Sequence, residues 1–106
     1  MYISANAMAV DLAAAIRPTV LALLVERGVA KDCETADDML VVDVLQVERN
    51  AIVHVYMYAD TLLRVEHMVC KVKGGASSAT RIVLFNQLMD KCKGMVTRIL
   101  RERDER

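Results

Sequence analysis

Two histidines and one cysteine have the clearest capacity for chemistry in this sequence. His54 lies in one segment rich in β-branched residues, and His67 and Cys70 lie in the next. Imidazole titrates near neutral pH, so it can act as a base or bind a metal. His67 and Cys70 are three positions apart, which on a strand directs their side chains to opposite faces. No third group is placed to orient a base, and we therefore predict no catalytic residue in this chain.

The register of two predicted strands decides whether the histidines meet. If the turn centres on Thr61, one face is apolar apart from His67, and His54 lies on the other face with Cys70. If the turn is the pair Asp60-Thr61, His54 and His67 become cross-strand neighbours. We favour the first register because of its apolar face. A metal site built from both histidines and a carboxylate needs the second, so we predict no metal and no cofactor.

The segment Lys73-Gly74-Gly75-Ala76-Ser77-Ser78 is the sharpest local motif, and it joins a predicted strand to a predicted helix. Free N–H groups at a helix start, with cations nearby, suit an anion. The Gly-Lys-Ser/Thr ending of a nucleotide-binding P-loop is absent. Glycine for a turn and serine as the N-cap is the simpler interpretation. The residues that would form an anion site are Lys71, Lys73, Ser77, Ser78 and Arg81.

Length and composition indicate one domain, residues 1–106, with an unusually apolar sequence. Apolar residues make up 55% of the chain, although aromatic residues make up only 4%. Lys plus Arg and Asp plus Glu number 14 each, so the formal net charge is zero. A nucleic-acid binder usually shows a basic excess, whereas a charge near zero favours self-association. Three widely spaced cysteines form neither a disulfide framework nor a zinc motif, and we expect reduced thiols in the cytoplasm.

The run from Ala5 to Val25 contains only two charges, Asp11 and Arg17. We predict a helix over 4–27 that is apolar nearly all round and kinked at Pro18, because an interior proline removes one hydrogen bond. Charges and a proline at the centre of the run argue against a membrane span. A helix of this kind needs cover on more than one side. Part of that cover is expected to come from a partner.

The rest of the chain predicts three strands and a second long helix. The acidic segment 29–38 is expected to be a loop, in which Thr35 and Asp38 could form a capping box for a short helical turn. Strands are predicted over 39–47, 52–58 and 62–73, with a helix as the alternative for the first. Their antiparallel meander is followed by a helix over 79–103. The predicted fold is a two-layer α+β domain in the order α-β-β-β-α.

This order, with a Gly-Ser loop before the last helix, resembles the double-stranded-RNA-binding domain in topology. That family carries a Lys-Lys-x-Ala-Lys motif at the start of the last helix. The stretch from Ser77 to Arg81 here reads Ser-Ser-Ala-Thr-Arg, with a single cation. We therefore transfer no RNA contact to this chain.

The function that this pattern favours is association. We expect a small non-enzymatic interaction module, of the adaptor, chaperone or inhibitor type, that acts as a homodimer and has a further protein partner. The alternative is an anion- or nucleic-acid-binding accessory domain that uses the Lys73–Ser78 loop, and no membrane is expected as a partner. Helix 4–27 and the sheet face that the helices leave bare are the candidate surfaces. The candidate interface residues are Ala5, Met8, Ala9, Leu12, Ala13, Ile16, Tyr56, Tyr58 and Met68.

Overall fold

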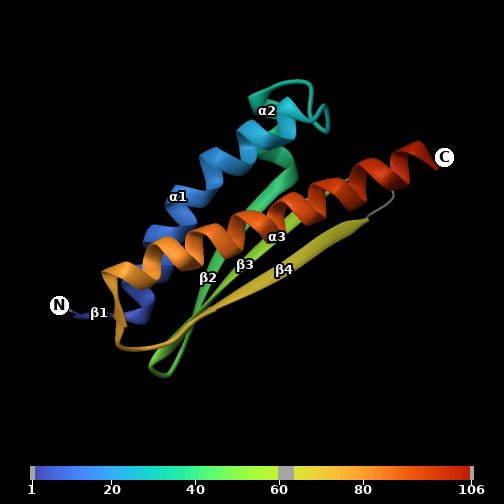
Figure 1. The fold of residues 1–106 in the computed structure, drawn as a ribbon. Coiled ribbons are helices and arrows are strands. Elements are labelled where there is room, and N and C mark those ends of the chain that lie inside the picture. Colours follow the sequence, from blue (N-terminus) through green and yellow to red (C-terminus); the bar gives the residue numbers. More distant parts are fainter. Residues whose placement is uncertain (1, 60–63, 106) are drawn as a thin grey trace.

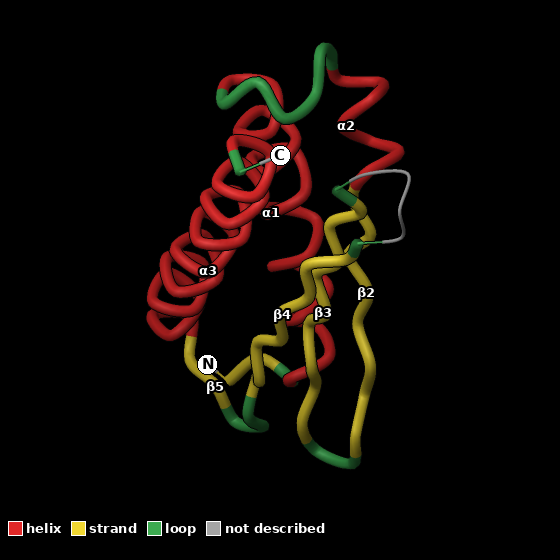
Figure 2. The backbone as a smooth tube through the Cα atoms, turned by 90° about the vertical axis from the view of Figure 1, so that its right-hand side faces the viewer, coloured by secondary structure: helices red, strands yellow, loops and turns green. Residues whose placement is uncertain are grey.

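The chain folds into one layer of helices and one layer of antiparallel sheet. The computed structural model describes residues 2–59 and 64–105. The elements in this part are, in chain order, β1 (Tyr2–Ile3), α1 (Ala5–Glu26), α2 (Cys33–Met39), β2 (Leu40–Val47), β3 (Asn50–Tyr58), β4 (Val65–Val72), β5 (Ala76–Ser77) and α3 (Ser78–Asp104). The main sheet has the order β2-β3-β4, and β1 pairs with β5 in a separate two-stranded sheet. Both long helices lie on the same side of the main sheet (Figures 1 and 2). The α+β architecture predicted from the sequence is confirmed.

Helix α1 begins as the sequence predicts and buries its apolar stripe. The Ser4 hydroxyl accepts a hydrogen bond from the Ala7 N–H at 3.1 Å, as an N-cap does. The helix runs through Pro18, and the kink there stays a prediction. By length and composition α1 could cross a membrane, a test that core helices also pass. Here it packs against β2, β3 and α3. Its buried stripe consists of Met8, Leu12, Ile16, Val20, Leu23 and Leu24.

The acidic segment before β2 contains more helix than the sequence predicted. Helix α2 is capped by Asp32, whose Oδ1 accepts from the Thr35 N–H at 2.8 Å. The predicted Thr35–Asp38 capping box is therefore wrong, because the cap lies one turn earlier. This contact stabilises the ionised carboxylate and lowers the pKa of Asp32. The guanidinium of Arg17 on α1 pairs with Asp37 of α2 and donates to the Leu40 carbonyl at 3.1 Å. Arg17 therefore links α1 to the end of α2 and to the start of β2.

The register that we favoured for β3 and β4 is wrong. In the structure Tyr56 pairs with His67, and His54 pairs with Val69. Directly opposite residues in an antiparallel pair share a face. His67 therefore lies on the same face as His54, whereas Cys70 lies on the other face and is buried. The observed pairing differs from the favoured one by one residue. Such a shift moves every side chain of a strand to the opposite face of the sheet relative to its neighbour.

The connection between β3 and β4 is longer than either turn considered from the sequence. The Ala59 N–H donates to the Arg64 carbonyl at 3.0 Å, and β3 ends at Tyr58 whereas β4 begins at Val65. The predicted turn residues Asp60 and Thr61 lie outside the described residues. A longer loop shifts the pairing because the register of a hairpin depends on loop length.

The hydrophobic core lies between the inner face of the sheet and the two long helices. Strand β3 contributes Ala51, Val53, Val55 and Met57, all with no exposed surface. Helix α3 contributes an apolar stripe to the core, in which Leu88, Cys92, Met95 and Ile99 are buried. None of the buried residues in the described part of the chain is polar or charged. The inner face of the sheet is thus fully used within the chain, and the opposite face is free.

Candidate functional site: the outer face of the sheet

The sheet presents one bare surface, which we call the outer face. Figure 2 shows the long helices on one side of the strands, and within residues 2–59 and 64–105 it shows no helix that covers the other side. The pairing of β2 with β3 and of β3 with β4 fixes which side chains share this face. The outer-face residues are Val41, Asp43, Leu45 and Val47 of β2, Ile52, His54, Tyr56 and Tyr58 of β3, and Val65, His67, Val69 and Lys71 of β4.

The outer face holds most of the large apolar side chains that the described residues expose. Eight such side chains are exposed, and five of them lie on this face, with exposed fractions between 39% and 53%. These five are Leu45, Val47, Tyr58, Val65 and Val69. Single exposed apolar residues are ordinary, whereas a contiguous group marks an interaction surface.

A stacked cluster of one tyrosine and two histidines lies near the middle of the outer face, and we call it the imidazole cluster. It consists of His54, Tyr56 and His67. The rings of Tyr56 and His67 stack with centroids 4.3 Å apart and planes 7° from parallel, as their direct cross-strand pairing allows. The His54 Nδ1 and the His67 Nε2 are 3.1 Å apart. The Tyr56 hydroxyl is 3.5 Å from the same His54 nitrogen.

The outer face carries little charge, and the two signs lie on different strands. Asp43 of β2 pairs across the sheet with His54, and Lys71 lies on β4. The other charged side chains of β4 and its flank turn toward α3, where Arg64 pairs with Glu102 and Arg98 pairs with Glu66. Depletion of charge is typical of the centre of a protein interface.

Most interface residues predicted on helix 4–27 are not available to a partner in this structure. Ala5, Met8, Ala9, Leu12 and Ile16 are buried in the chain's own core, and Ala13 is half-buried. Met68 packs on the core side of the sheet. Tyr56 and Tyr58 do lie on the outer face. Sequence reasoning missed Leu45, Val47, Val65 and Val69, although their alternation along β2 and β4 was a usable signal.

The structure does not bring a thiol and an imidazole together on one face. Cys70 is on the buried side of β4, and His54 is on the outer side. Burial raises the pKa of the Cys70 thiol, although nearby Lys91 opposes this, and burial raises the pKa of Cys92 to about 12. Only the thiolate is a strong nucleophile, so these two thiols are packing groups.

The residues of the predicted anion site are only partly brought together. Arg81 forms an ion pair with Asp11 of α1. Ser77 occupies the N-cap position of α3 but makes no capping hydrogen bond, and its hydroxyl is 3.2 Å from that of Thr80. Ser78 is the first residue of α3. Lys71, Lys73 and Thr80 line a cavity of ≈ 390 Å³, so two of the three cations face one space.

The two glycines of that loop have a structural explanation. A Cβ on Gly74 would lie 2.6 Å from the Arg49 carbonyl oxygen, and Gly75 has a φ of +77°. Gly74 also donates its N–H to the Asn50 side chain at 3.1 Å. The loop therefore packs directly on the β2–β3 turn, which only glycine permits at this distance.

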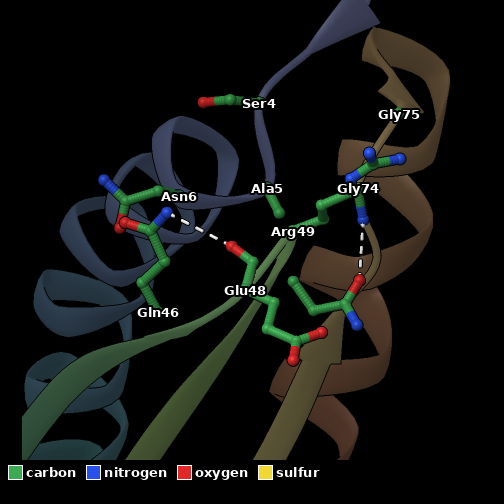
Figure 3. A pocket seen from close by; sticks show the side chains of 9 residues that line it. Ser4, Ala5, Asn6, Gln46, Glu48, Arg49, Gly74 and Gly75 are labelled. Carbon is green, nitrogen blue, oxygen red and sulfur yellow. Dashed lines mark hydrogen bonds between the residues drawn. The ribbon is translucent and has the colours of Figure 1, made fainter.

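A larger cavity of ≈ 950 Å³ lies between this loop, the β2–β3 turn and the start of α1 (Figure 3). Its lining is mixed, with amides from Asn6 and Gln46 and the charged side chains of Glu48 and Arg49. The Gln46 side chain donates to the Glu48 carbonyl at 3.4 Å. Among the described residues, the lining includes neither histidine nor cysteine.

Comparison with models of known protein families, with curated proteins and with solved structures finds no match. The function therefore has to be inferred from the residues of this chain. The outer face, with its apolar side chains and the imidazole cluster, is the feature that distinguishes the molecule from a closed two-layer domain.

Proposed function

We propose that this protein is a non-enzymatic interaction module that forms a homodimer through the outer face. The observation that supports this most directly is the group of exposed Leu45, Val47, Tyr58, Val65 and Val69 on a sheet side with no helical cover. Packing of two such faces would remove this apolar surface from water. A dimer of this kind could serve another protein as an adaptor, a chaperone or an inhibitor. Three free cysteines and the absence of a disulfide pattern favour the cytoplasm.

The distribution of charge favours a second copy as the occupant. The outer face carries one acid on β2, Asp43, and one base on β4, Lys71. A twofold axis lying close to the strand direction turns the β2 side of each copy toward the β4 side of the other. The acidic strand of one copy then faces the basic strand of its partner, which is an isologous and self-complementary arrangement. The zero net charge of the whole chain removes long-range repulsion between copies.

The size of the outer face predicts a weak dimer. Three strands of this length cover about 26 Å by about 14 Å. This footprint is roughly half of the ~800 Å² that each partner buries in an interface of standard size. We therefore expect dimerisation that depends on concentration in the micromolar range.

The test is a dilution series in analytical ultracentrifugation, with Leu45→Lys as the disrupting variant. A lysine at the exposed Leu45 adds a charge to the interface and leaves the core unchanged. We expect its dimer dissociation constant to rise about tenfold or more, with an unchanged melting temperature. Val10→Lys is the matched control, because Val10 on α1 is 51% exposed and Leu45 is 53% exposed. Val10→Lys should dimerise as the wild type does.

A wild-type protein that stays monomeric at high micromolar concentration would contradict the proposal. Equal weakening by Leu45→Lys and Val10→Lys would also contradict it, since general surface charge would then explain the loss. A dimer that Val10→Lys alone disrupts would place the interface on the helical layer.

The alternative function is binding of an anion or a nucleic acid at the loop before α3. The observation in its favour is the cavity that Lys71 and Lys73 share with Thr80. A Lys73→Ala, Arg81→Ala double variant should then bind RNA or inorganic phosphate more weakly, with a flatter salt dependence. Absence of any binding by the wild-type protein at low salt would end this alternative.

A further inference from the structure

We propose that the imidazole cluster is one half of a zinc site that two copies of this chain complete together. The inference deepens the proposed function and rests on it, because it needs a second copy seated on the outer face. His54 and His67 of each copy would supply two nitrogens, and the dimer would supply four. Zinc in proteins prefers four ligands in a tetrahedral arrangement, and imidazole is among its common ligands.

The spacing of the two histidines fits a pair of ligands on one metal ion. The His54 Nδ1 and the His67 Nε2 are 3.1 Å apart. Two nitrogens that bind one zinc at about 2.0–2.1 Å in a tetrahedron lie about 3.3 Å apart. His67 stacks on Tyr56 at 4.3 Å, and the rings of His54 and His67 are parallel within 3°. The two nitrogens face each other in this arrangement, so each ring would have to turn in its own plane to direct its lone pair at a shared metal.

One chain alone cannot complete such a site. Within the described ranges, no group of three or more histidine, cysteine, aspartate or glutamate side chains could hold a metal ion. The cysteines give no help, since Cys70 and Cys92 are buried on the other side of the sheet. The half-site is open toward solvent, because His67 is exposed and His54 is half-buried. The missing ligands must therefore come from outside the chain.

A twofold axis through the imidazole cluster provides these ligands. Two sheets pack face to face about 10 Å apart, so the midplane lies about 5 Å from each sheet. This distance is close to the reach of a histidine side chain, and the four nitrogens converge on the midplane. In a single chain the two facing nitrogens are 3.1 Å apart, and the tautomers of the two rings decide which nitrogen carries a proton. Both rings would bind zinc in the tautomers that place the proton on the other nitrogen, so that both facing lone pairs could be ligands.

A shared metal would also strengthen an interface whose footprint is small. A ligand that binds only the dimer shifts the monomer–dimer equilibrium by mass action. We therefore expect zinc to lower the dissociation constant of the dimer. The metal would hold the two sheets together at their centre, where hot spots of interfaces concentrate.

The experiment compares metal-free protein, prepared with a chelator that is then removed, with the same protein in zinc chloride. Sedimentation equilibrium gives the dimer dissociation constant, and titration calorimetry gives the stoichiometry. We expect one zinc per two chains and a dissociation constant lowered about tenfold or more by the metal. His54→Ala and His67→Ala should each abolish both effects and keep the wild-type circular dichroism. Lys93→Ala, which removes an exposed charge on α3 away from the outer face, is the control and should keep both. Cobalt(II) in place of zinc should show the visible absorption of a tetrahedral site.

The outcomes separate this inference from the proposed function. A dimer that forms equally without metal and binds no zinc overturns the zinc site and leaves the homodimer in place. Zinc bound at one ion per chain without association overturns the shared site. A zinc-linked dimer that both histidine variants retain places the metal elsewhere and overturns the assignment. A monomer under every condition overturns both proposals.

Discussion

The two faces of the main sheet are built from the same three strands but from different kinds of side chain. On the inner face, β3 presents Val53, Val55 and Met57, which are fully buried. Helix α1 packs on β3, and α3 packs on β4 and on α1. On the outer face, the same strand presents His54, Tyr56 and Tyr58. The inner face contains no polar group among its buried residues, whereas the outer face mixes apolar, aromatic and imidazole side chains.

This difference shows that apolar content alone does not define a core. Both faces carry valines on alternate positions, and the outer face has enough of them for an interior. The outer face differs because it also contains groups that need polar partners. His54, Tyr56 and His67 provide such partners for one another. Their polar atoms can also be satisfied by water, which suits a surface that is covered only part of the time. The comparison therefore predicts that inner substitutions affect folding, and that outer substitutions affect association.

Among substitutions that distinguish the core side of the sheet from the outer face, Ala9→Glu is expected to have the largest effect. From the sequence, Ala9 is a candidate interface residue. In the structure Ala9 has no exposed surface, so a glutamate there would bury an unpaired charge. We expect a loss of about 4 kcal/mol or more in the free energy of unfolding. Ala14→Glu is the control, since Ala14 lies on the exposed side of the same helix, and it should change stability by less than about 0.5 kcal/mol.

Urea unfolding followed by circular dichroism measures both variants. If Ala9→Glu keeps the wild-type stability and becomes monomeric, then α1 faces a partner and not its own sheet. That result would place the interface on the helical layer and not on the outer face of the sheet.

The sequence predicted the inner face well and the outer face poorly, for a physical reason. Helical stripes on α1 and α3 depend on local periodicity, and both helices bury such a stripe. The pairing of β3 with β4 depends on a loop whose length local pattern does not determine. Both strands alternate in a way that makes either register plausible on hydrophobic grounds. Placement of His67 therefore required the pairing itself, as did recognition of the imidazole cluster.

The second prediction concerns the thiol of Cys92 in the inner layer. Burial raises its pKa to about 12 from an ordinary value near 9. Between these values the unfolded chain loses the proton and the folded chain keeps it, so stability falls as pH rises through this window. Within this window the free energy of unfolding falls by about 1.4 kcal/mol per pH unit. The stabilisation from the protonated Cys92 thiol is fully present below pH 9, and it is lost as the pH approaches 12.

Cys92→Ala isolates this contribution, because other alkaline groups titrate equally in both proteins. The wild type should lose stability more steeply than the variant as pH rises above 9, in urea unfolding at each pH. Parallel slopes would mean that the thiol is accessible to solvent and that the inner layer is looser than described. The exposed Cys33 serves as an internal comparison, since a thiol reagent should modify it in the folded protein while Cys92 stays protected.

The smallest effect tests how two outer faces meet. If the β2 side of each copy lies over the β4 side of its partner, Asp43→Lys places like charges opposite each other, and Lys71→Asp does the same. Each single change should weaken the dimer by up to about 1 kcal/mol, or roughly fivefold, because such pairs are exposed. The double exchange restores opposite signs and should recover most of the wild-type affinity. A double variant whose loss equals the sum of the two single losses would show that the charges do not meet. The twofold axis would then run across the strands, with β2 over β2, and the dimer would depend on its apolar and imidazole contacts alone.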